Sequence, residues 1–166
     1  MTLHSTKYFG EIDLDNVEEY YEIGLELDNR TVELTINIST ASKIIDKESI
    51  SKIEDYIDNL QTNEKDIRSF ILEDFKEKGE SKNYIDFQIE GQDKEDIADL
   101  ISDANKKLNK REKLLSVLYL LRISFYPEVE DKVFAVYDYT IDDDLTDDLL
   151  VVILYKDNTA RITIES

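Results

Sequence analysis

The chain has 166 residues and a formal net charge of −19, and 36% of its residues are charged against 41% that are hydrophobic. A field of this sign repels the phosphates of nucleic acids and the anionic surfaces of membranes, so we expect direct binding to neither. With no cysteine and one histidine, His4, the chain cannot form disulfides, thiolate metal sites, a cysteine nucleophile or a histidine-based zinc site.

His4 lies near the N-terminus, in a segment that we expect to be frayed and solvated, so a catalytic triad built on it is not expected. The length predicts a single domain over residues 1–166 with one continuous core. The sequence has no run of about 18 apolar residues and no signal-like apolar segment at its start. Together with the lack of cysteine, which suits a reducing compartment, this predicts a soluble cytoplasmic protein. No glycine-rich phosphate loop is found, and no cofactor is expected.

Strand-like alternation dominates the first forty residues. Residues 8–17 predict a short strand or ordered arm that bends at Gly10. Residues 20–28 and 31–39 alternate apolar with polar side chains, and the residue types at positions 28–30 tolerate turn conformations. The sequence therefore predicts a β-hairpin with one wet face and one apolar face, the latter formed by Tyr21, Ile23, Leu25, Leu27, Val32, Leu34, Ile36 and Ile38.

The middle of the chain changes to a helical period. Apolar residues recur at spacings of three and four over residues 50–60 and 67–75, which predicts two amphipathic helices. Thr62 or Asn63 is expected to cap the second helix, and Gly79 is expected to end it.

A weaker helical signal follows. Residues 83–90 predict one or two helical turns, and Asp93 is expected to cap a longer helix. Residues 111–127 begin with a helical pattern and end with a strand pattern, and we place the switch near Ser116. The apolar residues expected on the longer helix are Ile97, Leu100, Ile101, Ala104 and Leu108.

The last quarter of the chain alternates again. Four apolar runs cover residues 118–128, 132–140, 149–156 and 160–166, separated by short acidic or turn-forming segments. This pattern predicts an antiparallel meander. The expected fold is α+β: an N-terminal β-hairpin and a C-terminal four-stranded antiparallel meander share or stack into antiparallel sheet, with the central helices packed on the sheet.

Two acidic features interrupt the meander. Asp138 lies between two tyrosines of one strand, either on the wet face of the sheet or buried with Arg122 or Arg161 as its partner. The loop between the second and third strands lacks the alternate ligands and the glycine of an EF-hand. A solvated turn and a partner-facing loop are therefore its main interpretations, and a metal site is a third. The acidic residues of this loop are Asp142, Asp143, Asp144, Asp147 and Asp148.

The charge and the 10 tyrosines favour a binding function. Tyrosine and carboxylate side chains on one surface can recognise arginine and lysine, although tyrosine is equally ordinary in a half-buried sheet. We therefore expect a non-enzymatic protein that binds a basic protein partner such as a toxin or nuclease, for instance as an immunity or inhibitor protein. The alternatives are a DNA-mimicking inhibitor and a carboxylate-based protein that binds divalent metal ions. The predicted partner-binding residues are Asp138, Tyr139, Asp142, Asp143, Asp144, Asp147 and Asp148.

Four short motifs stand out along the chain: YFGEIDL from Tyr8, YPE at 126–128, DYT at 138–140 and the terminal ES. Together they resemble a family of small acidic bacterial domains of unknown function, over nearly the full length of the chain. The resemblance implies no catalytic residue, because no activity is established for that family. It suggests the following residues for a first test: Tyr126, Pro127, Glu128, Asp138, Tyr139, Thr140, Thr146, Glu165 and Ser166.

Overall fold

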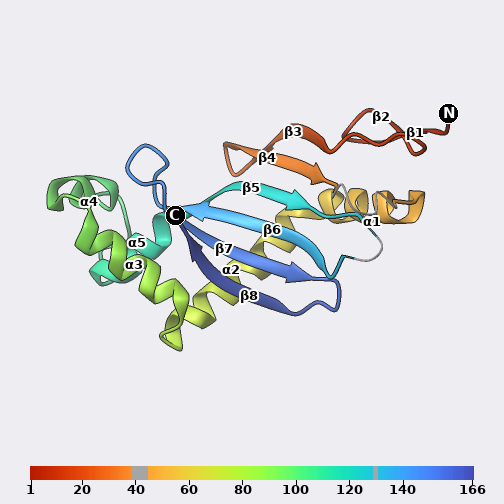
Figure 1. The fold of residues 1–166 in the computed structure, drawn as a ribbon. Coiled ribbons are helices and arrows are strands. Elements are labelled where there is room, and N and C mark those ends of the chain that lie inside the picture. The colour runs from red at the N-terminus through yellow and green to blue at the C-terminus, as the bar shows by residue number, and fades with distance from the viewer. Residues whose placement is uncertain (39–44, 129–130) are drawn as a thin grey trace.

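The structure, a computed structural model, describes residues 1–38, 45–128 and 131–166 (Figure 1). It is an α+β fold in which strands precede and follow a central run of helices. The elements in chain order are β1 (Leu3–Ser5), β2 (Glu11–Asp13), β3 (Tyr20–Leu27), β4 (Arg30–Asn37), α1 (Lys47–Asp58), α2 (Leu60–Lys76), α3 (Glu80–Gly91), α4 (Lys94–Leu100), α5 (Lys110–Val117), β5 (Tyr119–Phe125), β6 (Val133–Thr140), β7 (Leu149–Tyr155) and β8 (Ala160–Glu165).

Six of the strands form one mixed sheet in the order β3-β4-β5-β6-β7-β8. Its last four strands are consecutive antiparallel neighbours, so the predicted meander is confirmed. The prediction of a purely antiparallel sheet is wrong, because β4 and β5 run parallel, with Leu34 opposite Ile123. The described helices all lie between β4 and β5 in the chain, and they provide the long crossover that a parallel pair needs.

The predicted hairpin is confirmed as β3 and β4, with a shorter turn than expected. Asp28 and Asn29 alone make the turn, and Arg30 already pairs with Leu27. Both turn residues have left-handed φ angles, 50° and 63°, as a type I′ turn requires and as Asp and Asn tolerate.

The N-terminal segment forms a two-stranded sheet of its own, in which β1 pairs with β2. The bend at Gly10 is confirmed by a φ angle of 75°. The expectation of a frayed segment at His4 is wrong, because His4 lies in β1 opposite Ile12. Its Nε2 atom is buried and has no hydrogen-bond partner among the described residues.

The first two predicted helices are confirmed as α1 and α2, but their boundaries differ from the prediction. Neither Thr62 nor Asn63 caps α2, because α2 begins at Leu60, whose buried side chain starts the apolar face of this helix. Gly79 does not take the left-handed position after α2. Lys78 does so, with a φ angle of 62°, and Gly79 precedes the first residue of α3.

The later helices also differ from the prediction in length. α3 extends well beyond one or two turns, because contacts with the rest of the protein bury Tyr84 and Gln88. α4 begins after Asp93 as predicted, although the Asp93 side chain makes no capping hydrogen bond. It ends at Leu100, so the expected Ile101, Ala104 and Leu108 lie beyond it. The change from α5 to β5 falls at Leu118, close to the predicted position. No helix within the described ranges is long and apolar enough to cross a membrane.

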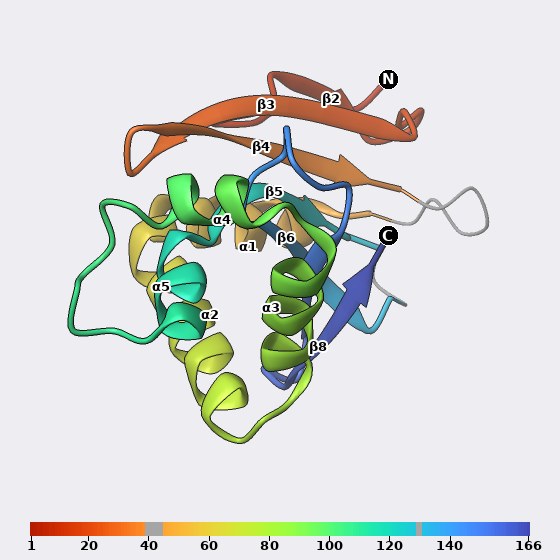
Figure 2. The same ribbon diagram turned by 90° about the vertical axis from the view of Figure 1, so that its left-hand side faces the viewer.

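The prediction that the central helices pack on one face of the sheet is confirmed for α1 and α2, which contact β6 through Tyr56 and Glu64. In Figure 1, α1 and α2 pass behind the strands, while α3, α4 and α5 lie toward the left-hand end, which faces the viewer in Figure 2. The Tyr137 hydroxyl of β6 hydrogen-bonds to that of Tyr56 in α1. Alternate residues of β6 therefore point into the core, and the residues between them point to the opposite face.

An ion pair within α2, whose carboxylate is buried, faces the sheet. Glu64 is only 2% exposed, and its Oε1 accepts hydrogen bonds from Arg68 Nε at 2.6 Å and from the Tyr139 hydroxyl at 3.1 Å. Arg68 also donates from Nη1 to the Leu118 carbonyl at 2.8 Å. Because a buried carboxylate is costly without partners, these contacts fix α2 against the start of β5 and the end of β6.

Candidate functional site

The acidic loop, residues 141–148, joins β6 to β7 and projects at the end of the sheet where α3 and α5 lie (Figure 1). It contains most of the residues that the sequence predicts to bind a partner. Asp143, Asp144 and Asp147 are exposed, whereas Asp142 and Asp148 are partly buried. The acidic loop therefore presents carboxylates to solvent and is attached to the protein through its other side chains.

Helix α3 holds both ends of the acidic loop. The Tyr84 hydroxyl accepts a hydrogen bond from the backbone N–H of Ile141 at 3.3 Å and donates one to the Asp148 carbonyl at 3.1 Å. Gln88 donates from Nε2 to Oδ2 of Asp148 at 3.1 Å. Burial raises the pKa of Tyr84, so its hydroxyl stays protonated and remains a donor at neutral pH.

A second anchor comes from β5 and from the hairpin turn. The Tyr119 hydroxyl donates to Oδ1 of Asp143 at 2.6 Å and accepts from the backbone N–H of the same residue at 3.1 Å. Burial raises the pKa of Tyr119, and its hydrogen bond to the Asp143 carboxylate adds to the rise. The Arg30 guanidinium lies 3.7 Å from the centroid of the Tyr119 ring, a cation–π contact that brings the hairpin to the same anchor.

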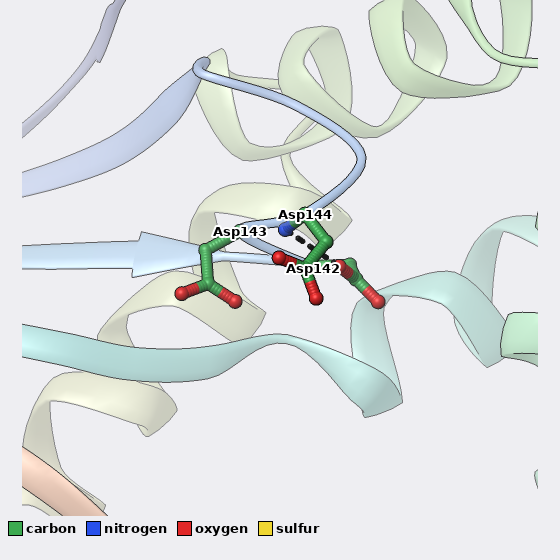
Figure 3. Close-up of side chains that lie close together, drawn as sticks. All are labelled: Asp142, Asp143 and Asp144. Atoms are coloured by element: carbon green, nitrogen blue, oxygen red, sulfur yellow. Dashed lines mark hydrogen bonds between the residues drawn. The ribbon is translucent and has the colours of Figure 1, made fainter.

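Asp142 is the centre of a tight turn within the acidic loop (Figure 3). Its Oδ1 accepts hydrogen bonds from the backbone N–H groups of Asp144 at 2.8 Å and Leu145 at 3.2 Å. Carboxylate oxygens of Asp142, Asp143 and Asp144 lie within 4.8 Å of one another, and oxygen ligands of this kind suit hard cations such as Ca²⁺ or Mg²⁺. Two of these carboxylates already accept hydrogen bonds from the protein, and a cation would compete with those donors.

Asp138 lies apart from the acidic loop, on the face of the sheet away from the helices. It is 5% exposed, and its Oδ2 accepts hydrogen bonds from Nε and Nη2 of its cross-strand neighbour Arg122 at 2.9 and 2.6 Å. Each of the two interpretations is thus right in part: Asp138 lies on the outer face of the sheet, but its carboxylate is buried and paired with Arg122, of whose side chain 42% stays exposed. Burial raises the pKa of Asp138 even though the hydrogen bonds from Arg122 oppose the rise, and the charges of Glu165 and Glu33 add to it.

Tyr139 lies in the core. It is 0% exposed, and its ring stacks on that of Tyr137 with the centroids 6.2 Å apart. A partner cannot reach this side chain in the folded protein, so its prediction as a partner-binding residue is corrected. Asp138 is also a poor partner contact, because Arg122 already compensates its charge.

Two threonines help to shape the acidic loop: Thr140, the last residue of the DYT motif, and Thr146, within the loop. The hydroxyl of Thr140 accepts a hydrogen bond from the backbone N–H of Asp142 at 3.2 Å, and that of Thr146 accepts one from Asp148 at 3.1 Å. Glu165 pairs with Leu149 where the loop enters β7. The YPE motif at 126–128 follows the opposite end of β5 and lies away from the acidic loop.

The sequence did not reveal the anchors of the acidic loop. Tyr84, Gln88 and Tyr119 lie 24 to 64 residues from their loop partners in the chain. Arg30 acts on the loop indirectly, through its contact with the ring of Tyr119. No periodic pattern indicates contacts of this range. The tyrosine-rich composition was the one signal available, and it does not identify which tyrosines face the loop.

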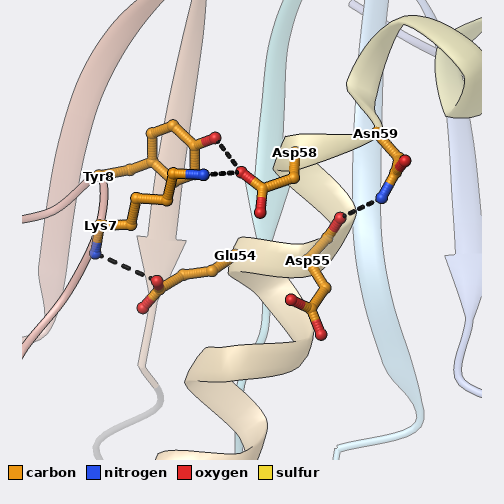
Figure 4. Close-up of polar contacts among 6 residues, drawn as sticks. All are labelled: Lys7, Tyr8, Glu54, Asp55, Asp58 and Asn59. Carbon is orange, nitrogen blue, oxygen red and sulfur yellow. Dashed lines mark hydrogen bonds and ion pairs between the residues drawn. The ribbon is translucent and has the colours of Figure 1, made fainter.

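A second polar cluster ties the N-terminal segment to α1 (Figure 4). Lys7 Nζ lies 2.6 Å from Oδ1 of Asp58, and the Tyr8 hydroxyl donates to the same oxygen. The backbone N–H of Lys7 donates to Oε2 of Glu54 at 3.1 Å. The hydrogen bond from Lys7, followed by that from Tyr8, lowers the pKa of Asp58. These contacts hold the N-terminal segment against α1, and the polar groups that make them already have hydrogen-bond partners within the protein.

Comparison of the chain with protein-family models, with curated proteins and with solved structures found no match. The resemblance to a family of small acidic domains therefore stays a prediction.

Proposed function

We propose that the protein is a non-enzymatic binding protein whose acidic loop engages a basic protein partner, such as a toxin or a nuclease. The observation that carries this proposal is that the exposed carboxylates of Asp143, Asp144 and Asp147 lie on a loop whose backbone is anchored by Tyr84 and Tyr119. Carboxylates on a fixed backbone lose less entropy when cationic side chains bind them. An immunity or inhibitor role follows if the partner is a toxin or nuclease.

The net charge of −19 supports the same proposal at longer range. A field of one sign steers an oppositely charged protein toward the surface and raises the association rate, most strongly at low salt. The shape of the loop then provides the local recognition. The long-range steering and the local binding of cationic side chains by the loop both rely on charge, so both weaken as salt screens that charge.

Affinity capture from a bacterial lysate tests the proposal. The tagged protein should retain a basic protein at low salt and release it in about 1 M NaCl, where the Debye length is about 3 Å. Failure to capture any basic protein, or capture that is insensitive to salt, would count strongly against the proposal.

Two variants of equal charge separate the acidic loop from the net charge. The loop variant combines Asp143→Asn, Asp144→Asn and Asp147→Asn. The helix variant changes exposed acids of α1 and α2 and removes the same three negative charges. Capture should be lost with the loop variant and kept with the helix variant, which combines Asp55→Asn, Asp66→Asn and Glu73→Gln.

A divalent-cation site in the same loop is the second candidate function. It is favoured by the carboxylate oxygens of Asp142, Asp143 and Asp144, which lie within 4.8 Å of one another. Calorimetric titration with Ca²⁺, Mg²⁺ and Mn²⁺ tests it. A binding heat that disappears in the loop variant would support the site, and no heat with any of the three ions would rule it out.

A further inference from the structure

A pocket of about 420 Å³ lies between α2, α5 and Leu108, and it shares no lining residue with the acidic loop. Its volume falls within the range of small-molecule binding sites. Leu72, one of its lining residues, is 46% exposed, so apolar surface of the pocket faces solvent. The apolar residues that line the pocket are Ile71, Leu72, Phe75, Leu108, Leu115 and Leu118.

The pocket also has cationic side chains in its lining, Arg68 and Lys76. The hydrogen bonds from Arg68 to Glu64 and to the Leu118 carbonyl fix the plane of its guanidinium, while 38% of the side chain stays exposed. A guanidinium has five N–H donors, so Arg68 can bind a second carboxylate without releasing Glu64.

Two lining residues, Leu108 and Glu112, belong to residues 106–113, the most basic stretch of the chain. Residues 106–113 carry one acidic side chain, Glu112, which lines the pocket. Its carboxylate accepts hydrogen bonds from the backbone and side chain of Asn109 in a capping box, so Glu112 is already used by the protein. The basic side chains of this stretch do not line the pocket, and Arg111 is paired with Asp86. The side chains of the lining that can meet an anion are those of Arg68 and Lys76.

We propose that this pocket binds an amphiphile with a medium-length acyl chain and a carboxylate head, such as a fatty acid anion of about ten carbons. The chain lies against Ile71, Phe75 and Leu115, and the carboxylate binds Arg68 with support from Lys76. Apolar burial supplies the affinity, and the fixed guanidinium selects the head group. The proposal is independent of the function proposed for the acidic loop.

Isothermal titration with three ten-carbon ligands, below their micelle concentrations, tests both parts of the proposal. Decanoate should bind in a 1:1 complex, and decanol and decyltrimethylammonium should bind at least tenfold more weakly. Octanoate should bind roughly fifteenfold more weakly than decanoate, because it lacks two methylenes and each buried methylene contributes about fourfold in affinity. No binding of decanoate at millimolar concentration, or equal binding of the cationic ligand, would overturn the proposal.

Exposed positions allow variants that keep the protein folded. Leu72→Glu and Lys76→Glu each place a carboxylate in the lining of the pocket and should weaken decanoate binding at least tenfold. Lys65→Glu on the same helix and Phe87→Gln on α3, where Phe87 is 59% exposed, lie outside the lining and should leave it unchanged. Thermal unfolding checks that each variant is folded. Binding that is unaffected by both pocket variants would overturn the proposal.

A second copy of the chain is the competing occupant of this apolar pocket. It would appear in sedimentation as a concentration-dependent dimer that Leu72→Glu disrupts and that decanoate does not dissociate. That result would also overturn the proposal, whereas a monomer that binds decanoate supports it.

Discussion

Tyr119 connects three parts of the molecule through one side chain. Its hydroxyl holds Asp143 by two hydrogen bonds, and its ring lies under the guanidinium of Arg30. The position of the first exposed carboxylate of the acidic loop thus depends on a residue of β5 and, through it, on the hairpin turn. The fixed shape on which the proposed function rests is set at this residue and at Tyr84.

The variant Tyr119→Phe removes the hydroxyl and keeps the ring. We expect it to destabilise the protein by about 0.5–1.5 kcal/mol, the usual net contribution of a hydrogen bond, and to speed amide exchange at Asp143. Urea unfolding and hydrogen exchange measure these effects. Tyr155→Phe is the matched control, since no hydrogen bond of the Tyr155 hydroxyl is found in the described part of the chain. Equal effects of the two variants would contradict the anchoring role.

Gly79 is a second residue whose identity the structure requires. A Cβ atom at this position would lie 2.1 Å from Oδ1 of Asp74, whose other oxygen accepts the backbone N–H of Ser81 at 2.8 Å. Gly79→Ala should therefore destabilise the protein by about 1–3 kcal/mol, because Asp74 must move. Gly91→Ala is the control, as a Cβ there meets nothing within 4 Å. Chemical unfolding of both variants decides the point, and a Gly79→Ala protein as stable as the control would contradict it.

At the scale of elements, the spacing of the apolar residues and the residue types at the turns predicted most of the helices and strands. The spacing of Ile50, Ile53 and Ile57 indicated α1, and the alternation of β5 to β8 indicated the meander. α3 was underestimated because Tyr84 and Gln88 are buried by contacts with the distant acidic loop. The parallel join of β4 and β5 was missed because the sequence of a strand does not identify its neighbour.

The candidate site shows the same division between local and distant information. The sequence itself shows the aspartates of the acidic loop, and it leaves the pairing of Asp138 with Arg122 as one of two alternatives. Tyr139 was placed on a surface because its neighbours are acidic, yet its position in the strand points it into the core. Only tertiary contacts distinguish these cases.

The tie between the N-terminal segment and α1 predicts a pH dependence. The folded-state pKa of Asp58 lies below its ordinary value of 3.8, since Lys7 and Tyr8 hydrogen-bond to the charged form. Its contribution to stability is fully present above pH 3.8 and is lost as the pH falls through the lower folded-state pKa. The difference in unfolding free energy between the wild type and Asp58→Asn should therefore shrink as the pH falls below about 4.

Unfolding of both proteins by urea between pH 7 and pH 2 measures this difference. Asp55→Asn removes the same charge from the same helix at a position outside the Lys7–Asp58 pair, and it is the control for the loss of one charge. A difference for Asp58→Asn that stays constant down to pH 2 would contradict the role given to the Lys7–Asp58 pair.

At the scale of the whole molecule, the net charge of −19 should oppose folding, because like charges come closer in the compact state. Raising NaCl from about 10 mM to about 150 mM shortens the Debye length from about 30 Å to about 8 Å. We expect the thermal unfolding midpoint at pH 7 to rise over this range. A midpoint that falls would mean that ion pairs such as Arg122–Asp138 outweigh the repulsion.

The most direct test of the central claim is the affinity of the captured basic partner for the wild type, the loop variant and the helix variant, measured by calorimetry at about 150 mM NaCl. Three lost ion pairs of about 0.5–1 kcal/mol each should weaken binding of the loop variant roughly ten- to a hundredfold. The helix variant carries the same net charge and should bind within about threefold of the wild type. Equal losses in the two variants would contradict the claim, because they would show that the partner responds to net charge and not to the acidic loop.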